Sequence, residues 1–165
     1  MSFYFRWTAN RAKWTAAVFV PIVVTAVAVG AGCAVNQAEP DDSDLRLESA
    51  SHAFGGRFDY LIVKSAGEVA DRAFVEYSRT TGSSDLAKKL VARLAPAERK
   101  PVRIMVTGQN SEKTLQVILD ALAAYQGRRL PYLELLYLGE PGYAPRIESA
   151  VRELGGSFHF QPFAS

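Results

Sequence analysis

The sequence of 165 residues contains one cysteine and two histidines, which restricts its covalent and metal chemistry. A single cysteine, Cys33, excludes an intramolecular disulfide. Since no CxxC, HxxxH or related spacing of ligands occurs, the sequence predicts no metal site. His52 lies in a polar stretch and is interpreted as a solvent-exposed residue. We expect His159, between two phenylalanines, to be an edge or half-buried residue and not a catalytic base.

The sequence also lacks the loops that bind nucleotides and the turns that present catalytic serines. Neither GxxxxGK[ST] nor GxGxxG occurs, and neither histidine follows a nucleophile elbow. Glu134 and Glu140 lie roughly 20 Å apart if both are on one strand, which is too far for them to act on one bond. We therefore predict that the protein is not an enzyme and holds no cofactor.

Charge of one sign is not concentrated anywhere in the folded part. The net charge is +2, and the basic residues between positions 88 and 103 are offset by Asp85 and Glu98. Nucleic-acid binding proteins usually carry a concentrated basic face. The sequence therefore predicts no nucleic-acid partner, and this stretch is interpreted as a solvated helix face and loop.

Residues 1–33 have the layout of an export segment. Residues 1–13 contain Arg6, Arg11 and Lys13 and no acidic residue, and residues 14–38 carry no charge. A basic stretch, then an apolar stretch, then small residues is typical of a secretory signal. Uncharged residues enter hydrocarbon at low cost, while the basic flank stays on the cytoplasmic side. We predict that the remainder of the chain works outside the cytoplasm.

The end of this segment, residues 29–33, resembles the cleavage box of bacterial lipoproteins. Ala31 and Gly32 match the small residues that precede the invariant cysteine, which here is Cys33, and Gly30 stands where the pattern has an aliphatic residue. The resemblance implies a lipid on Cys33, and we favour this outcome. By resemblance to lipoprotein sorting, Ala34 in place of Asp argues against retention in the inner membrane.

Two other outcomes fit the same residues. Residues 14–32 are long enough to remain as a transmembrane helix, or a signal peptidase releases the domain after the small residues. With a lipid on Cys33 or with a retained transmembrane helix, the protein is held in the bacterial cell envelope, and its domain faces the periplasm or the exterior.

The rest of the chain divides into a linker and a domain. Residues 34–56 are polar, acidic near positions 39–44 and without a sustained apolar period, which predicts a flexible linker. Within it, residues 45–53 allow a short helix. Residues 57–165 are predicted to form the extracytoplasmic domain.

The domain shows strand and helix patterns in alternation. Helices are predicted over 68–79, 86–94, 112–126 and 145–154, and strands over 58–64, 102–107, 132–138 and 157–161. The order strand-helix-helix-strand-helix-strand-helix-strand favours an α/β fold with a small, mostly parallel sheet of about four strands and flanking helices. Strand 132–138 is apolar almost throughout, which predicts burial of both faces. The more alternating strands 102–107 and 157–161 are expected nearer an edge.

Two loops follow predicted strands at the carboxyl end of the sheet, where ligands tend to bind in open α/β sheets. The first loop leads into a helix N-terminus, which favours anions. The candidate ligand-binding or partner-binding residues in these loops are Gly108, Asn110, Ser111, Glu140 and Tyr143, with Lys113 and Thr114 as further contributors to an anion site.

The combination of an anchor, a linker and a modest domain predicts a membrane-tethered envelope protein that acts as a non-enzymatic interaction or assembly module. Its expected partners are the membrane and other envelope proteins, with a secretion or conjugal transfer system as a special case. Strand 157–161 is a candidate for pairing with another chain. Six aromatic residues are expected to form core or, alternatively, a partner surface: Tyr132, Tyr137, Tyr143, Phe158, Phe160 and Phe163. The alternative function is a small-ligand or anion-binding domain with hydrolytic activity that uses the two loops.

Overall fold

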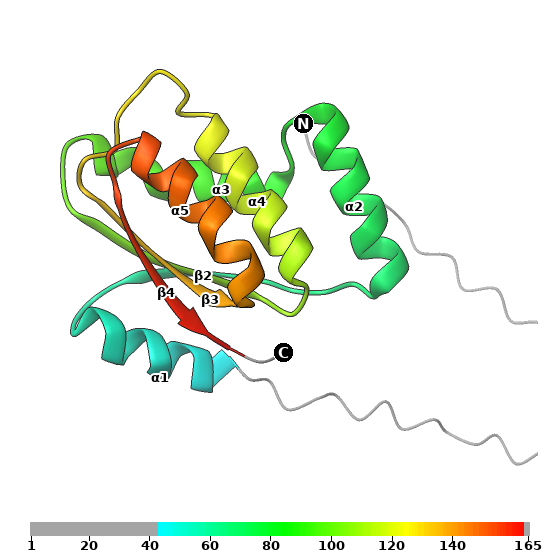
Figure 1. Cartoon of the computed structure of the whole chain (residues 1–165), viewed down its shortest axis with the longest axis horizontal. Coiled ribbons are helices and arrows are strands. Elements are labelled where there is room, and N and C mark those ends of the chain that lie inside the picture. The colour runs from blue at the N-terminus through cyan, green and yellow to red at the C-terminus, as the bar shows by residue number, and fades with distance from the viewer. Residues whose placement is uncertain (1–42, 164–165) are drawn as a thin grey trace, which may run out of the picture. The chain divides into compact units, whose positions relative to one another are not determined.

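The computed structural model describes residues 43–163, which form an α/β domain around one parallel sheet (Figure 1). No helix within that range is both long and apolar enough to cross a membrane. The predicted export segment and the lipidation site at Cys33 lie outside the described residues. The elements are α1 (Ser43–Phe54), β1 (Asp59–Val63), α2 (Glu68–Thr81), α3 (Asp85–Leu94), η1 (Ala95–Glu98), β2 (Val102–Gly108), α4 (Ser111–Ala123), β3 (Leu133–Gly139), η2 (Pro141–Tyr143), α5 (Ala144–Glu153) and β4 (Ser157–Pro162).

The predicted order of strands and helices is confirmed, and the helix ends follow local chemistry. The Ser84 side chain accepts a hydrogen bond from the Ala87 N–H and caps α3, and Asn110 caps α4 by accepting from the Lys113 N–H. These side chains satisfy backbone donors that have no partner inside the helix. Helix α2 ends at Gly82, which adopts the left-handed conformation that glycine tolerates best.

The sheet order is β1-β2-β3-β4 and every neighbouring pair is parallel. Because each strand lies beside its predecessor and such crossovers are right-handed, all the connecting helices lie on one face. The strand order never reverses, so the sheet lacks the topological switch point at which doubly wound folds open a ligand crevice. The rule that ligands bind beyond the carboxyl ends of the strands therefore gives weaker support for a ligand site in this sheet.

The main core lies between the sheet and α3, α4 and α5. The opposite face is covered by α1, whose Ala50 and Phe54 pack with Met105, Leu136 and Leu138 in a second, smaller cluster. Residues 43–54 were assigned to the linker from their polarity, with a short helix allowed at 45–53. They form a longer helix, whose few apolar side chains pack against this second face of the sheet.

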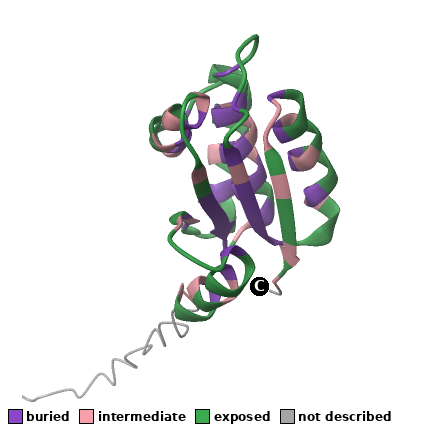
Figure 2. Ribbon diagram, turned by 90° about the vertical axis from the view of Figure 1, so that its left-hand side faces the viewer, coloured by how far each residue is buried: buried purple, intermediate pink, exposed green. Residues whose placement is uncertain are grey.

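The positions of the strands differ from expectation in one case. Strand β2 lies between β1 and β3, so the prediction that 102–107 is near an edge is wrong. Its polar residues do not mark exposure: Thr107 is buried and accepts a hydrogen bond from α1, while Arg103 forms an ion pair with Glu134 on β3. Strand β3 is buried on both faces, as predicted. Strand β4 is an edge strand, also as predicted, and is largely exposed (Figure 2).

Candidate functional site

The loops that follow β2 and β3 lie side by side, so the predicted site residues are brought together. Asn110, Ser111, Glu140 and Tyr143 line a depression of about 250 Å³ with Gln109 and Glu112. The Ser111 hydroxyl donates a hydrogen bond of 3.0 Å to Oε1 of Glu140 and joins the two loops.

The fifth predicted residue, Gly108, has a packing role. A Cβ atom at position 108 would lie 2.2 Å from the Thr114 hydroxyl oxygen and 2.7 Å from the Val63 carbonyl oxygen. Gly139 at the end of β3 is comparable, because its Cβ would lie 2.4 Å from the Tyr137 hydroxyl oxygen. Glycine at both strand ends therefore permits close approach of neighbouring side chains.

Two carboxylates line the depression, and one of them is paired with a cation. Glu112 and Glu140 line it, while Lys113, which was expected to support an anion, is buried and donates to Asp71 at 2.7 Å and to the Lys64 carbonyl at 2.9 Å. Thr114 is also buried and donates to the Asn110 carbonyl. The Lys113 ammonium is thus held away from the depression, whereas Arg79 Nη2 lies 2.8 Å from Oε1 of Glu112 and pairs with that carboxylate.

The Asp71–Lys113 ion pair is a site that the sequence did not indicate. Asp71 on α2 is fully buried, and its carboxylate also accepts hydrogen bonds from the Ser65 hydroxyl at 2.5 Å and the Ala66 N–H at 3.1 Å. Burial acts to raise the pKa of Asp71, but these hydrogen bonds and the Lys113 ammonium outweigh it, and the pKa lies below its usual value. The pair joins residues 42 positions apart, so no local sequence pattern could indicate it.

A second unpredicted feature is the hydroxyl of Tyr137, beneath the depression. Tyr137 is fully buried, and among residues 43–163 its hydroxyl oxygen is the buried side-chain atom without a hydrogen-bond partner. Burial raises the pKa of Tyr137, although Ser111 and the backbone at Glu140 lie near enough to oppose this. Neither Ser111 nor the backbone at Glu140 meets the distance and angle of a hydrogen bond to the Tyr137 hydroxyl. The ring stacks on Phe160 of β4 at a centroid distance of 6.0 Å.

Arg46 fixes α1 at the same end of the sheet. It is buried, donates to the Thr107 hydroxyl and lies over the Phe163 ring at 4.1 Å. An arginine in a polar helix reads as a solvated residue, and only the fold shows that it holds α1 and the end of β4 together.

The outward edge of β1 is closed by side chains at Tyr60 and Lys64, while the outward groups of Ile62 between them have no partner within the described residues. The Gln109 N–H donates to the Val63 carbonyl, so Val63 points its backbone toward β2 and the alternate residue Tyr60 points outward. The Tyr60 N–H donates to Asp59 Oδ1 at 2.8 Å, and its carbonyl accepts from Arg93 of α3. Both outward groups of Tyr60 are therefore satisfied within the chain.

The outward edge of β4 is open. The Phe163 N–H donates to the Gly139 carbonyl, so odd-numbered residues of this segment face β3 and Phe158, Phe160 and Pro162 face outward. Within the described residues no group bonds to the outward N–H or C=O of Phe158 and Phe160. Pro162 has no N–H to leave unpaired, which is the usual setting of proline in an edge strand. This surface, the outward backbone of 158–162, is called the β4 edge below.

Glu134 and the two histidines are not among the residues that line the depression. Glu134 pairs with Arg103 at 2.9 Å and does not line the depression that contains Glu140. His159 is exposed and meets the edge of the Phe54 ring, with centroids 6.2 Å apart, and His52 is 3.9 Å from Glu48. Among the residues that the structure covers, no three His, Cys, Asp or Glu side chains are grouped to hold a metal ion.

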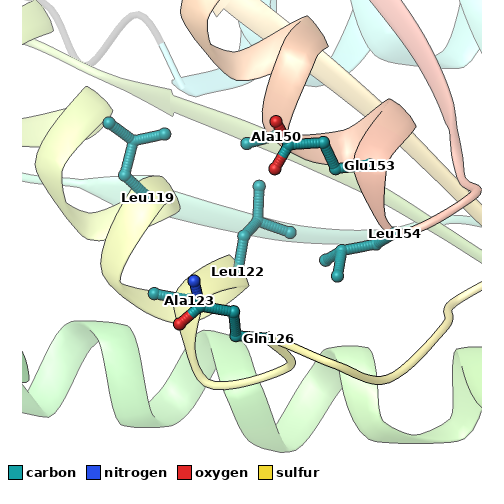
Figure 3. A pocket seen from close by; sticks show the side chains of 7 residues that line it. All are labelled: Leu119, Leu122, Ala123, Gln126, Ala150, Glu153 and Leu154. Carbon is teal, nitrogen blue, oxygen red and sulfur yellow. The ribbon is translucent and has the colours of Figure 1, made fainter.

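A groove of about 180 Å³ lies between α4 and α5 (Figure 3). Leu119, Leu122 and Ala123 line it from α4, and Ala150 and Glu153 from α5. The groove identifies the flank of α5 that faces α4.

Comparison with known proteins gives no match, whether with family models, curated proteins or solved structures.

Proposed function

We propose that this protein is a membrane-tethered module of the bacterial cell envelope that acts by binding another polypeptide and not by catalysis. The observation that carries the proposal is the β4 edge, where the N–H and C=O groups of Phe158 and Phe160 point outward without partners. Natural proteins usually protect such edges with charges, bulges or covering elements. An edge left unprotected is suited to the addition of a strand from another chain.

The composition of β4 supports the same function. Its sequence SFHFQP carries no formal charge at neutral histidine, and Phe160 is 36% exposed. Aromatic side chains are favoured at protein interfaces because they bury a large area. The layout of the N-terminal segment, with a lipid on Cys33 as the favoured attachment, supports the envelope location.

The proposal is tested by amide hydrogen exchange on the full chain, extracted from its native membrane in mild detergent. Strand addition protects the Phe158 and Phe160 amides, which would exchange quickly in an unpaired edge. A chain with His159→Lys, which places a charge in the middle of the edge, is expected to lose part of that protection. Fast exchange of both amides in the native extract would contradict the proposal.

The second candidate is a small-ligand site in the depression, favoured by the meeting of the two loops and by the unpartnered Tyr137 hydroxyl beneath it. Because Glu140 lines it without a cationic partner among the described residues, a small organic cation fits better than an anion. Titration with arginine amide, followed by NMR shifts of residues near Tyr143, is expected to show binding that Glu140→Gln weakens. Equal shifts with inorganic phosphate would instead support the anion-binding form.

A further inference from the structure

We infer that the strand added at the β4 edge is β4 of a second copy, paired antiparallel across a two-fold axis. This inference rests on the proposed function and names its partner. The pairing of the two β4 strands joins the four strands of each copy into one continuous sheet. A two-fold interface uses the same surface twice, so the surface must complement itself.

The hydrogen-bonding groups of the edge meet that condition. Phe158 and Phe160 each offer one N–H and one C=O outward. In an antiparallel pair, two directly opposed residues can exchange both hydrogen bonds. When Phe158 faces Phe160 of the second copy, the two-fold places Phe160 against Phe158 of that copy. All the outward donors of both residues are then satisfied.

Pro162 selects this register. With Phe158 opposite Phe160 of the second copy, the two-fold axis passes at His159. If the axis passed at Phe160 instead, Phe158 would face Pro162, which has no N–H to donate. Moving it to Phe158 would leave Phe160 opposite Gly156, whose N–H already donates to the Val151 carbonyl at 3.0 Å. The register with His159 on the axis therefore retains the most hydrogen bonds.

The side chains near the edge also permit self-pairing. Phe158 and Phe160 lie on the face that carries α5, and the register sets each against the other, an aromatic pair of the kind that stabilises sheets. The central residue, His159, is neither an acidic nor a permanently charged side chain, so the axis carries no obligatory like-charge contact.

The neighbouring flank of α5 adds no net charge. Ala150 and Glu153 face α4 across the groove (Figure 3), so residues rotated the other way lie toward the β4 edge. On that flank Glu148 and Arg152 form an ion pair within α5. This flank therefore brings no net charge to the approach of two copies.

Register-specific disulfide formation tests the inference on the full chain in detergent or native membranes. Residues on the axis, as a non-hydrogen-bonded pair, have Cα atoms about 4.5 Å apart, within the range of a disulfide. His159→Cys is expected to give a disulfide-linked dimer under mild oxidation, absent from the parent that retains Cys33. Ser157→Cys is the matched control, since it lies two residues from the axis and faces Gln161 of the second copy. Equal cross-linking at both positions would overturn the register.

Sedimentation of the full chain in density-matched detergent tests the association itself. We expect a concentration-dependent dimer that His159→Lys weakens by a factor of roughly two to five, because two ammonium groups then face each other, and that His159→Gln preserves. A monomer at all concentrations would overturn the second-copy inference. If the monomer still shows protected Phe158 and Phe160 amides in native extracts, the proposed function stands with a different partner; if those amides exchange fast as well, both fail.

Discussion

The two edges of the sheet are the most instructive pair of regions in this molecule. At β1, Asp59 and Arg93 satisfy the outward groups of Tyr60, and Lys113 takes the carbonyl of Lys64. At β4, nothing in the described chain takes the outward groups of Phe158 and Phe160. The sheet thus has two outward positions satisfied along β1, at Tyr60 and Lys64, with Ile62 between them left open, and no outward position of Phe158 or Phe160 satisfied along β4.

The difference is built from distant residues. Arg93 comes from α3, which contacts β1, and Lys113 comes from the first turn of α4, from which its ammonium reaches the Lys64 carbonyl after β1. Within residues 43–163, no side chain or backbone group bonds to the outward N–H and C=O groups of Phe158 and Phe160.

The largest expected effect comes from breaking the buried ion pair on the β1 side. Asp71→Ala leaves the Lys113 ammonium buried without its carboxylate, and we expect a loss of about 3–5 kcal/mol in the free energy of unfolding. Urea denaturation of the full chain in mild detergent, followed by circular dichroism, measures it. Replacing both partners, with Asp71→Leu and Lys113→Met, should recover much of the loss. Equal losses in the single and double variants would show that the pair itself contributes little.

The same pair predicts a pH dependence. The pKa of Asp71 is lowered in the folded protein, so its contribution is fully present above the unfolded value of 3.8 and is lost as the pH falls through the folded pKa. Wild type should therefore exceed Asp71→Asn in stability at pH 7, and the difference should shrink below pH 3.8. Denaturation of the two chains at several pH values measures it. A difference that stays constant into the acid range would contradict the lowered pKa.

On the open side, Gly139→Ala is expected to disturb the packing beneath β4. The added Cβ meets the Tyr137 hydroxyl, and the ring must shift from its stacking on Phe160. Overpacking of this kind costs about 1–3 kcal/mol, measured by the same denaturation. Gly142→Ala is the control, since nothing lies within 4 Å of its Cβ and its φ is not positive. Similar losses in both variants would show that the Tyr137 contact is not the cause.

The sequence predicted the main elements because their signals are local. Ser84 and Asn110 cap α3 and α4 with side chains that lie immediately before each helix, and the nearly continuous apolar run of β3 indicated its burial. It also predicted that the loops at Gly108 and Gly139 follow strands. Since parallel strands end at one edge, the meeting of those loops could be anticipated.

What the sequence could not supply depends on contacts between distant residues. Arg46 and Lys113 look like solvated cations in their own helices, and only the fold buries them against Thr107 and Asp71. The alternation in β2 resembled an edge because Thr107 and Arg103 have partners in other elements. Whether a polar residue is exposed or satisfied is a tertiary property, and the same applies to whether an edge is open.

The smallest effect on stability, and the sharpest test of the comparison, is expected from opening the β1 edge at Tyr60. Arg93 is partly exposed, so Arg93→Ala should cost less than about 1 kcal/mol. It frees the Tyr60 carbonyl, and we expect new, concentration-dependent association through β1. Sedimentation should be done in a His159→Lys background, where pairing at the β4 edge is weakened. Arg72→Ala, which breaks a comparable exposed ion pair on α2, is the matched control. If the Arg93 variant remains as monomeric as that control, the surrounding helices protect β1, and the difference between the edges lies in what covers them and not in which backbone groups are satisfied.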